Sequence, residues 1–211
     1  LLREVREHYW VPGYQKQKPT HVPEMGKDEV KKIKLAGEKY LLRPLHPSDE
    51  RRLQEFFYSH NKETLLMRYS HHPKQMSREK AATLVAVDQA RDLALCIVKR
   101  KGPKEEIEAV GRYYFIEQTN TAEVAFVVRE IHQGKGMAKT LLNEMLDIAK
   151  QRGIDKMQAY VRAENKPMLR VFERHQFERK PSESPSEAYL ELDVETAQPV
   201  EIVEKKKTKA N

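Results

Sequence analysis

A short glycine-containing turn is the part of this sequence best suited to bind an anion. Its residues, Gln133-Gly134-Lys135-Gly136-Met137-Ala138, follow an alternating run at Ala122–Val128 and precede apolar residues that recur at helical spacing as far as Ile148. Glycine has no Cβ, so the backbone of such a turn can approach a ligand closely. The N–H groups at the start of a helix favour a phosphate or pyrophosphate. The sequence therefore predicts a strand–turn–helix that binds a phosphorylated group, with one carboxylate, Glu123, in the strand leading into it.

Length and composition indicate one domain with solvated ends. The chain has 211 residues, of which 39% are hydrophobic and 34% are charged. We expect a lead-in or linker over residues 1–28, a folded domain over residues 29–195 and a charged, disordered tail over residues 196–211. The net charge of +7 suits a polyanionic partner. Nucleic acid, a phosphorylated cofactor and an acidic protein surface all meet that description.

The cysteine content and the apolar runs indicate where the protein works. The single Cys96 lies in an apolar run and cannot form an internal disulfide, which indicates a reducing, cytoplasmic compartment and a buried thiol. No apolar run approaches the ~20 residues that cross a bilayer, so we expect no membrane partner. The chain begins without methionine, which indicates a processed product or a piece of a longer polypeptide.

The remaining patterns place the turn within a mixed sheet. Residues 30–35 and 40–45 are predicted to form a hairpin, followed by helices that start near Ser48, around residue 65 and at Ser77, the last of these running to Val87. Strands are expected at residues 93–99, 107–117, 122–129, 154–162 and 189–194, with helices from Met137 to about Arg152 and from Asn165. Consecutive strands favour antiparallel pairing, and strand–helix–strand favours a right-handed crossover. The predicted fold class is α+β, with a central mixed, mostly antiparallel sheet flanked by helices.

These motifs resemble a known family. The turn at residues 133–138 resembles the acyl-CoA-binding signature of the GNAT family of N-acetyltransferases. The segments from Asn165 to Met168 and from Phe172 to Phe177 fall where that family has its next helix and strand. A closer similarity, at residues 42–50, 54–57 and 122–128, is to the GNAT domains of bacterial protein lysine acetyltransferases. Similar domains are fused behind acyl-CoA synthetase or acetyl-CoA hydrolase/transferase domains, and the lead-in suits a domain taken from such a fusion.

The resemblance implies an enzyme that moves an acetyl group from acetyl-CoA to a primary amine, either a protein lysine or a small amine. It implies that Glu123 is the general base, with Glu117 a weaker rival. The acyl-CoA-binding residues that it implies are Phe126, Val127, Val128, Gln133, Gly134, Lys135, Gly136, Met137, Ala138, Asn165, Met168 and Phe172. Backbone N–H groups of the turn are expected to hold the pyrophosphate. Lys135 and Lys139 are expected either to add positive field there or to be merely solvated.

Several alternatives stay open. Many family members have a tyrosine acid where this chain has Phe172, so the general acid is unassigned, and a catalytically silent acyl-CoA sensor of a larger CoA-metabolising enzyme is the alternative function. Nucleic acid is disfavoured because no recognition motif accompanies the basic charge. His60, His71 and His72 have no metal-ligand spacing, so we expect solvated loop histidines and no metal. The acceptor, the acyl-chain preference and the oligomeric state are left open.

Overall fold

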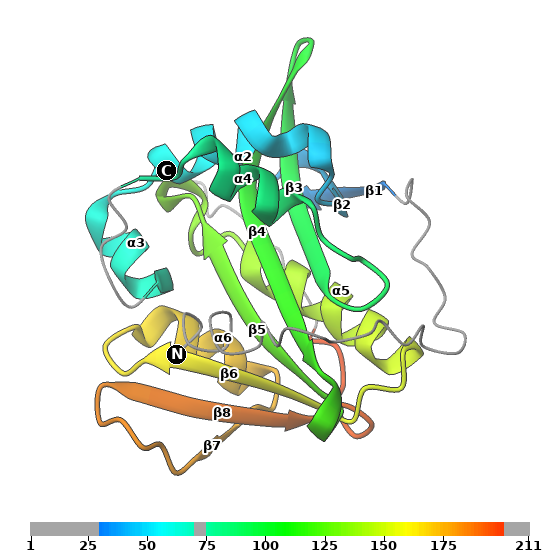
Figure 1. Ribbon diagram of the computed structural model, residues 1–211, viewed down its shortest axis with the longest axis vertical. Helices are drawn as coiled ribbons and strands as arrows, with labels where there is room; N and C mark the ends of the chain where they lie inside the picture. Colours follow the sequence, from blue (N-terminus) through cyan, green and yellow to red (C-terminus); the bar gives the residue numbers. More distant parts are fainter. Residues whose placement is uncertain (1–29, 70–74, 201–211) are drawn as a thin grey trace, which may run out of the picture.

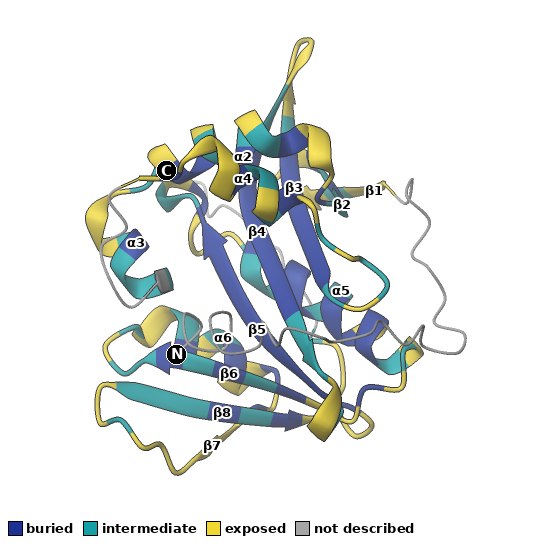
Figure 2. Cartoon of the chain, in the orientation of Figure 1, coloured by how far each residue is buried: buried dark blue, intermediate teal, exposed yellow. Residues whose placement is uncertain are grey.

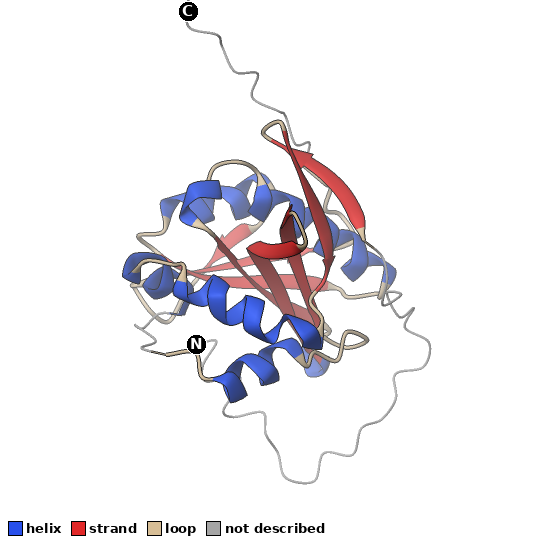
Figure 3. Ribbon diagram, turned by 90° about the horizontal axis from the view of Figure 1, so that it is seen from above, coloured by secondary structure: helices blue, strands red, loops and turns tan. Residues whose placement is uncertain are grey.

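The computed structural model describes residues 30–69 and 75–200, and this part of the chain forms one sheet with helices on both faces (Figures 1 and 3). The predictions for residues 1–28, for His71 and His72, and for the tail beyond residue 200 lie outside the described residues. The strands are β1 (Lys31–Leu35), β2 (Glu38–Pro44), β3 (Leu93–Lys101), β4 (Lys104–Ile116), β5 (Thr121–Val128), β6 (Lys156–Arg162), β7 (Glu178–Lys180) and β8 (Glu187–Asp193). The α-helices are α2 (Glu50–Tyr58), α3 (Lys62–Tyr69), α4 (Arg78–Val85), α5 (Met137–Gln151) and α6 (Lys166–Arg174). Short 3-10 turns are η1 (Pro47–Asp49), η2 (Glu117–Thr119) and η3 (Glu130–His132).

The sheet is mixed, as the sequence predicts. Within the described residues it has eight strands in the order β1-β2-β3-β4-β5-β6-β8-β7. Every neighbouring pair is antiparallel except β5 and β6, which are parallel and are connected through α5. The predicted α+β class with a mostly antiparallel sheet is therefore confirmed.

Helices cover both faces of the central strands, so these strands are apolar without interruption. In β3 the residues Leu93–Val98 are all buried, and Figure 2 shows the central strands as the buried part of the sheet. Leu95 and Ile97 pack in the core on the α5 side, whereas Cys96 and Val98 pack in the core beneath α2 and α4. The expected buried thiol is confirmed: burial raises the pKa of Cys96 to about 12, so the group stays protonated.

The parallel pair at the middle of the sheet separates soon after it forms. β5 and β6 are paired at Thr121–Lys156, Ala122–Met157 and Glu123–Gln158, and at no later position. Beyond Glu123, β5 stays bonded to β4 on its other side as far as Val128. β6 likewise stays bonded to β8 as far as Arg162. The two strands diverge in Figure 1, and the backbone of residues 124–128 has no strand partner on the β6 side.

Two features near the C-terminus differ from the sequence expectation. The short strand β7 was not predicted, because its three residues are exposed and charged and show no apolar alternation. The packed chain also extends past the predicted boundary at residue 195. Ala197 is fully buried. The Asn143 side chain on α5 donates a hydrogen bond to the Val200 carbonyl and accepts one from the Val200 N–H. The segment from Val194 to Val200 thus belongs to the folded domain.

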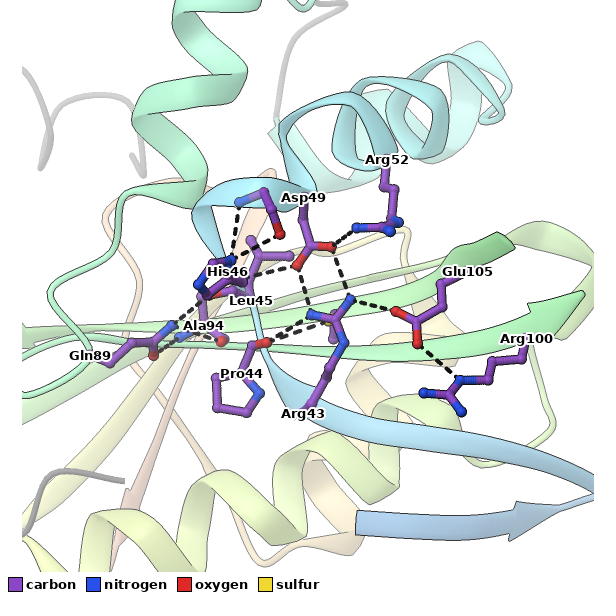
Figure 4. A network of polar contacts seen from close by, with 12 residues as sticks. Arg43, Pro44, Leu45, His46, Asp49, Arg52, Gln89, Ala94, Arg100 and Glu105 are labelled. Atoms are coloured by element: carbon purple, nitrogen blue, oxygen red, sulfur yellow. Dashed lines mark hydrogen bonds and ion pairs between the residues drawn. The ribbon is translucent and has the colours of Figure 1, made fainter. Parts of the chain in front are cut away.

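A buried carboxylate fixes the start of the helical layer (Figure 4). Asp49 is 0% exposed, and both of its oxygens accept hydrogen bonds from Arg43, at 2.7 and 2.9 Å. It also accepts from Arg52 Nη1 and from the His46 N–H, each at 2.9 Å. Burial alone would raise the pKa of Asp49, but the Arg43 guanidinium and the His46 N–H hold it below the usual value. This network ties the first turn of α2 to β2.

Candidate functional site

A groove of about 660 Å³ opens where β5 and β6 separate, and it contains most of the residues that the sequence singled out. This volume is typical of a site for a ligand of cofactor size. The predicted binding residues that line it are Phe126, Val127, Val128, Gln133, Gly134, Gly136, Met137, Ala138, Asn165, Met168 and Phe172. Among the predicted residues, Lys135 and Glu123 are not part of the lining. β5 and the turn on one side of the groove and α6 on the other therefore bring together residues from two distant parts of the chain.

The turn before α5 presents backbone donors to this groove. Gly134 and Gly136 have φ values of +73° and +91°, which glycine adopts without the penalty of a Cβ. α5 begins after Gly136 without a side-chain cap. The N–H groups of Gly134, Gly136, Met137 and Ala138 donate to no acceptor among the described residues. Four donors at a helix N-terminus are thus available to an anion in the groove.

Contacts beneath the turn hold it in this shape. His132, in η3, is 6% exposed, and its Nε2 lies 3.3 Å from Glu108 Oε2 on β4. Burial lowers the pKa of His132 and raises that of Glu108. A neutral imidazole can accept at Nδ1 from Lys135 Nζ, which lies 3.4 Å away. Gln133 Nε2 donates to the Val128 carbonyl at 3.2 Å, which fastens the turn to the end of β5.

The two lysines of the turn differ in position. The Lys135 ammonium points to His132, behind the turn, whereas Lys139 on the first turn of α5 lines the groove. The sequence left open whether both add positive field to the turn. In the structure only Lys139 of these two is placed along the groove itself.

α6 forms the opposite wall. The predicted helix start is confirmed, because Asn165 Oδ1 accepts a hydrogen bond from the Met168 N–H at 3.2 Å. Phe172 is 1% exposed, and its ring centroid lies 5.8 Å from that of Phe126 on β5 and 4.9 Å from that of Phe177. Phe172 is thus an apolar packing residue of the wall and brings no hydroxyl to the groove.

Glu123 lies where the two strands part. It is 1% exposed and belongs to the last bonded pair, in which Gln158 Nε2 lies 3.4 Å from Glu123 Oε2. The next residue, Val124, lines the groove. The Tyr189 hydroxyl lies 3.3 Å from Gln158 Oε1, so the amide of Gln158 is held between a tyrosine and the carboxylate. Glu123 is therefore a buried carboxylate directly behind the floor of the groove.

Sequence reasoning missed Tyr160 on β6, which lines the groove. Burial raises the pKa of Tyr160, and the nearby Glu123 charge raises it further. Its ring stacks on that of Tyr189 with centroids 5.0 Å apart. Tyr160 is two residues past Gln158, the strand partner of Glu123, and so lies on the same face of the sheet. The sequence alone does not give this register.

α3 supplies a second wall that the sequence did not place. The lining residues from this region are Asn61, Glu63, Thr64, Met67 and Arg68. The wall is anchored to the turn, because the Asn61 N–H donates to Glu130 Oε1 at 2.9 Å. A helix was predicted here, but no local pattern shows that it meets a loop almost seventy residues away.

The expectation that His60 is a solvated loop histidine is wrong. Its side chain is 1% exposed, packs edge-on against Phe56 with centroids 4.5 Å apart, and has Nδ1 3.5 Å from Glu130 Oε2. The turn that follows α2 folds His60 under the α3 wall, which residue types alone do not reveal. Across residues 30–69 and 75–200 no group of three or more His, Cys, Asp or Glu is placed to hold a metal. None of the helices there is both long and apolar enough to span a membrane.

Comparison with known proteins agrees with this geometry. Residues 39–178 match the family described as Acetyltransferase (GNAT) domain. Acetyltransferase PA5475 of Pseudomonas aeruginosa is 25% identical over 133 residues, which cover 63% of this chain and 71% of that protein. YwnH of Bacillus subtilis (strain 168), provisionally named a phosphinothricin acetyltransferase, is 44% identical over 57 residues, or 27% of this chain and 35% of YwnH. The crystal structure of the GNAT domain of S. lividans PAT superposes with a TM-score of 0.71 at 27% identity, covering 78% of this chain and 96% of that domain.

The match to the family covers well over half of the chain, and its range includes the diverging strands β5 and β6 and the glycine turn. The chain therefore belongs to the GNAT family of acetyltransferases. Its aligned segment spans about a third of the length of the Bacillus relative and most of the length of the Pseudomonas one.

Proposed function

We propose that this protein transfers an acetyl group from acetyl-CoA to a primary amine, with a protein lysine among the candidate acceptors. The observation that carries the proposal is the set of four backbone N–H groups, from Gly134 to Ala138, that line the groove and have no acceptor within the described chain. Their position at the start of α5 suits the pyrophosphate of a CoA ester. Lys139 adds positive charge on the same side of the groove.

The separated strands account for the rest of the donor. The backbone of Val124–Val128 has lost its β6 partner, and these residues line the groove. Pantetheine carries amide groups, which can take the place of the missing strand by bonding to this edge. An N–H group at the same edge can then polarise the thioester carbonyl. The donor would lie with its pyrophosphate at α5 and its thioester near Val124.

The acceptor chemistry belongs to the β5–β6 junction. An alkylammonium has a pKa near ~10.4, so at neutral pH the amine must lose a proton before it attacks. Glu123 takes that proton, through a water molecule because it lies behind the groove floor. The nitrogen then bonds to the acetyl carbon as the carbon–sulfur bond breaks. Tyr160 gives its hydroxyl proton to the departing thiolate, and the surplus proton on the acetylated nitrogen passes through water to the Tyr160 phenolate, while Glu123 releases its proton to solvent. The raised pKa of Tyr160 keeps its hydroxyl protonated beforehand.

Two measurements on the purified protein test this function. Acetyl-CoA is titrated first by calorimetry, and CoA thiol release is then followed with a panel of lysine peptides and small amines. We expect binding with one-to-one stoichiometry and amine-dependent thiol release. Binding with no release for any acceptor would instead support the acyl-CoA sensor, for which the packed Phe172 is the specific structural argument. No binding would reject both functions.

A further inference from the structure

A second cavity adjoins the groove, between the sheet and helices α2–α4. Its volume is about 30 Å³, enough for about two atoms of the size of a water oxygen. Arg68 and Val127 line both hollows, so the cavity lies on the α3 side of the groove. Most of its wall is apolar and includes Leu53, Phe57 and Leu84.

A buried arginine lines this cavity without an acidic partner. Arg112, on β4, is 6% exposed, and its Nη2 is fully buried and donates to no acceptor. No carboxylate of the described chain lies within the 4.0 Å that defines an ion pair with Arg112, and no acidic residue lines the cavity. His60 lines it as well, and its Nε2 is also buried without a hydrogen bond.

The buried Arg112 guanidinium would be stabilised by an anion from outside the chain. A guanidinium is always protonated in proteins, so Arg112 cannot escape the cost of burial by losing its proton. Burying a charge that has no partner is strongly unfavourable, whereas a carboxylate that accepts two hydrogen bonds removes much of the penalty. The described chain supplies no such group within ion-pair distance, and the small cavity has room for the two oxygen atoms of one. A carboxylate offers these donors two acceptor oxygens at once.

The sheet register places this cavity close to the reacting end of the groove. Arg112 is paired across the strands with Ala125, which lines the groove. Glu123 belongs to the next pair on the same face, opposite Tyr114. The Cα atoms of such diagonal neighbours are about 7–8 Å apart, so an acceptor that spans the two side chains is a short molecule.

We propose that the acceptor is an amine that carries a carboxylate a few bonds from its nitrogen, and that this carboxylate enters the small cavity against Arg112 while the amine lies near Glu123. His60 supplies a second donor at the cavity. The inference rests on the proposed acetyl transfer, since it names the acceptor class of that reaction.

Paired acceptors test the assignment. The ω-amino acids with two to five methylene groups are compared with their carboxamides, and kcat/KM is measured by thiol release. A charge-assisted hydrogen bond contributes about 10- to 150-fold, so the wild type should prefer each best-fitting acid over its amide by at least tenfold. In Arg112→Met the ratio should fall to about one. Arg78→Met removes a guanidinium from exposed α4, where it pairs with Glu50, and should keep the wild-type ratio.

A second measurement does not depend on turnover. Without CoA, sodium acetate should raise the thermal midpoint of the wild type more than sodium chloride of equal ionic strength, and should not do so in Arg112→Met. Should that variant not fold, Arg112→Lys keeps the charge on a shorter stem and should show a reduced acid preference and a reduced acetate effect.

Equal rates for acids and amides would overturn the inference and leave acetyl transfer intact. Transfer to no amine would overturn the proposed function and with it the acceptor class, while the acetate comparison would still decide whether the cavity binds a carboxylate. Acetate protection without an acid preference would assign the cavity to a free small carboxylate and overturn the acceptor.

Discussion

At the scale of single residues, the two candidate bases occupy different environments. Glu123 is 1% exposed and adjoins the groove at the point where β5 and β6 part. Glu117 is exposed, lies in η2 before β5 begins, and is separated from the glycine turn by the whole length of that strand. A base must reach the attacking nitrogen directly or through one water. Position therefore favours Glu123 over Glu117.

Replacing Glu123 by Gln keeps its size and removes its basicity. We expect Glu123→Gln to lower kcat by about 100-fold or more, the usual contribution of a general base. The dissociation constant of acetyl-CoA, measured by calorimetry, should change less than about twofold, because the carboxylate is remote from the turn at α5. Glu117→Gln is the matched control and should retain wild-type turnover. Unchanged turnover of Glu123→Gln at neutral pH would contradict its role as base.

In the proposed mechanism, the hydroxyl of Tyr160 takes the place of the acid that Phe172 cannot provide. A thiol has a pKa near ~8.5, so the thiolate is a tolerable leaving group and the benefit of an acid is modest. We expect Tyr160→Phe to lower kcat by about tenfold with acetyl-CoA affinity retained. Tyr58→Phe, which alters an exposed tyrosine of α2 outside both hollows, serves as the control. If Tyr160→Phe has the wild-type kcat, the thiolate leaves without help from this residue.

At the scale of elements, the start and end of α5 provide a matched pair of glycines. Gly134 has φ +73° and Gly153 has φ +64°, and an added Cβ would meet no atom within 4 Å at either position. An alanine in this backbone region costs about 1–2 kcal/mol, so both Gly→Ala variants should lose similar stability in urea unfolding. Gly134→Ala should also weaken acetyl-CoA binding at least tenfold, because relaxation of φ turns the N–H groups away from the groove. Gly153→Ala should bind normally, and equal affinities would argue against the turn as the anion site.

The helical layer depends on the network around Asp49. Removing one partner of a buried ion pair costs about 3–5 kcal/mol, since the remaining charge is left uncompensated. Asp49→Asn should therefore lower the free energy of unfolding by about 3 kcal/mol in urea titration at pH 7. Glu55→Gln breaks the exposed pair with Arg51 on the same helix, where both side chains are more than half exposed. That change should cost less than about 1 kcal/mol, and a similar loss in the two variants would show that the Asp49 network is not a special anchor.

At the scale of the whole molecule, local patterns predicted the elements but not how distant ones meet. The apolar runs and capping residues located the main strands and helices, and the order of elements implied the mixed sheet. The single carboxylate in β5 and the glycine turn were also visible locally. By contrast, the packing of α3 against the turn, the burial of His60 and the unpaired Arg112 depend on contacts between residues far apart in the chain. Residue type alone would place these polar side chains at the surface.

Three buried histidines make the stability of the whole fold depend on pH. Burial lowers the pKa values of His60, His132 and His175 in the folded state. An unfolded histidine protonates near pH ~6.5, whereas each folded one remains neutral to lower pH. Below about pH 6.5 the unfolded chain thus binds more protons, and the free energy of unfolding must decrease as the pH falls. The raised pKa of Glu108 acts in the opposite direction, because the folded state then takes up a proton first on acidification.

Urea unfolding at pH 7.5, 6.5 and 5.5 measures this dependence. We expect stability to fall between pH 6.5 and 5.5, with each buried histidine contributing at most about 1.4 kcal/mol per pH unit. His60 is suited to a test, because its side chain is 1% exposed and neither of its ring nitrogens makes a hydrogen bond within the described chain. His60→Gln should show a shallower decline of stability with acid than the wild type. His46→Gln, which changes an exposed histidine, is the control variant. A wild-type stability that is constant or rises from pH 6.5 to 5.5 would mean that Glu108 or other carboxylates outweigh the histidines.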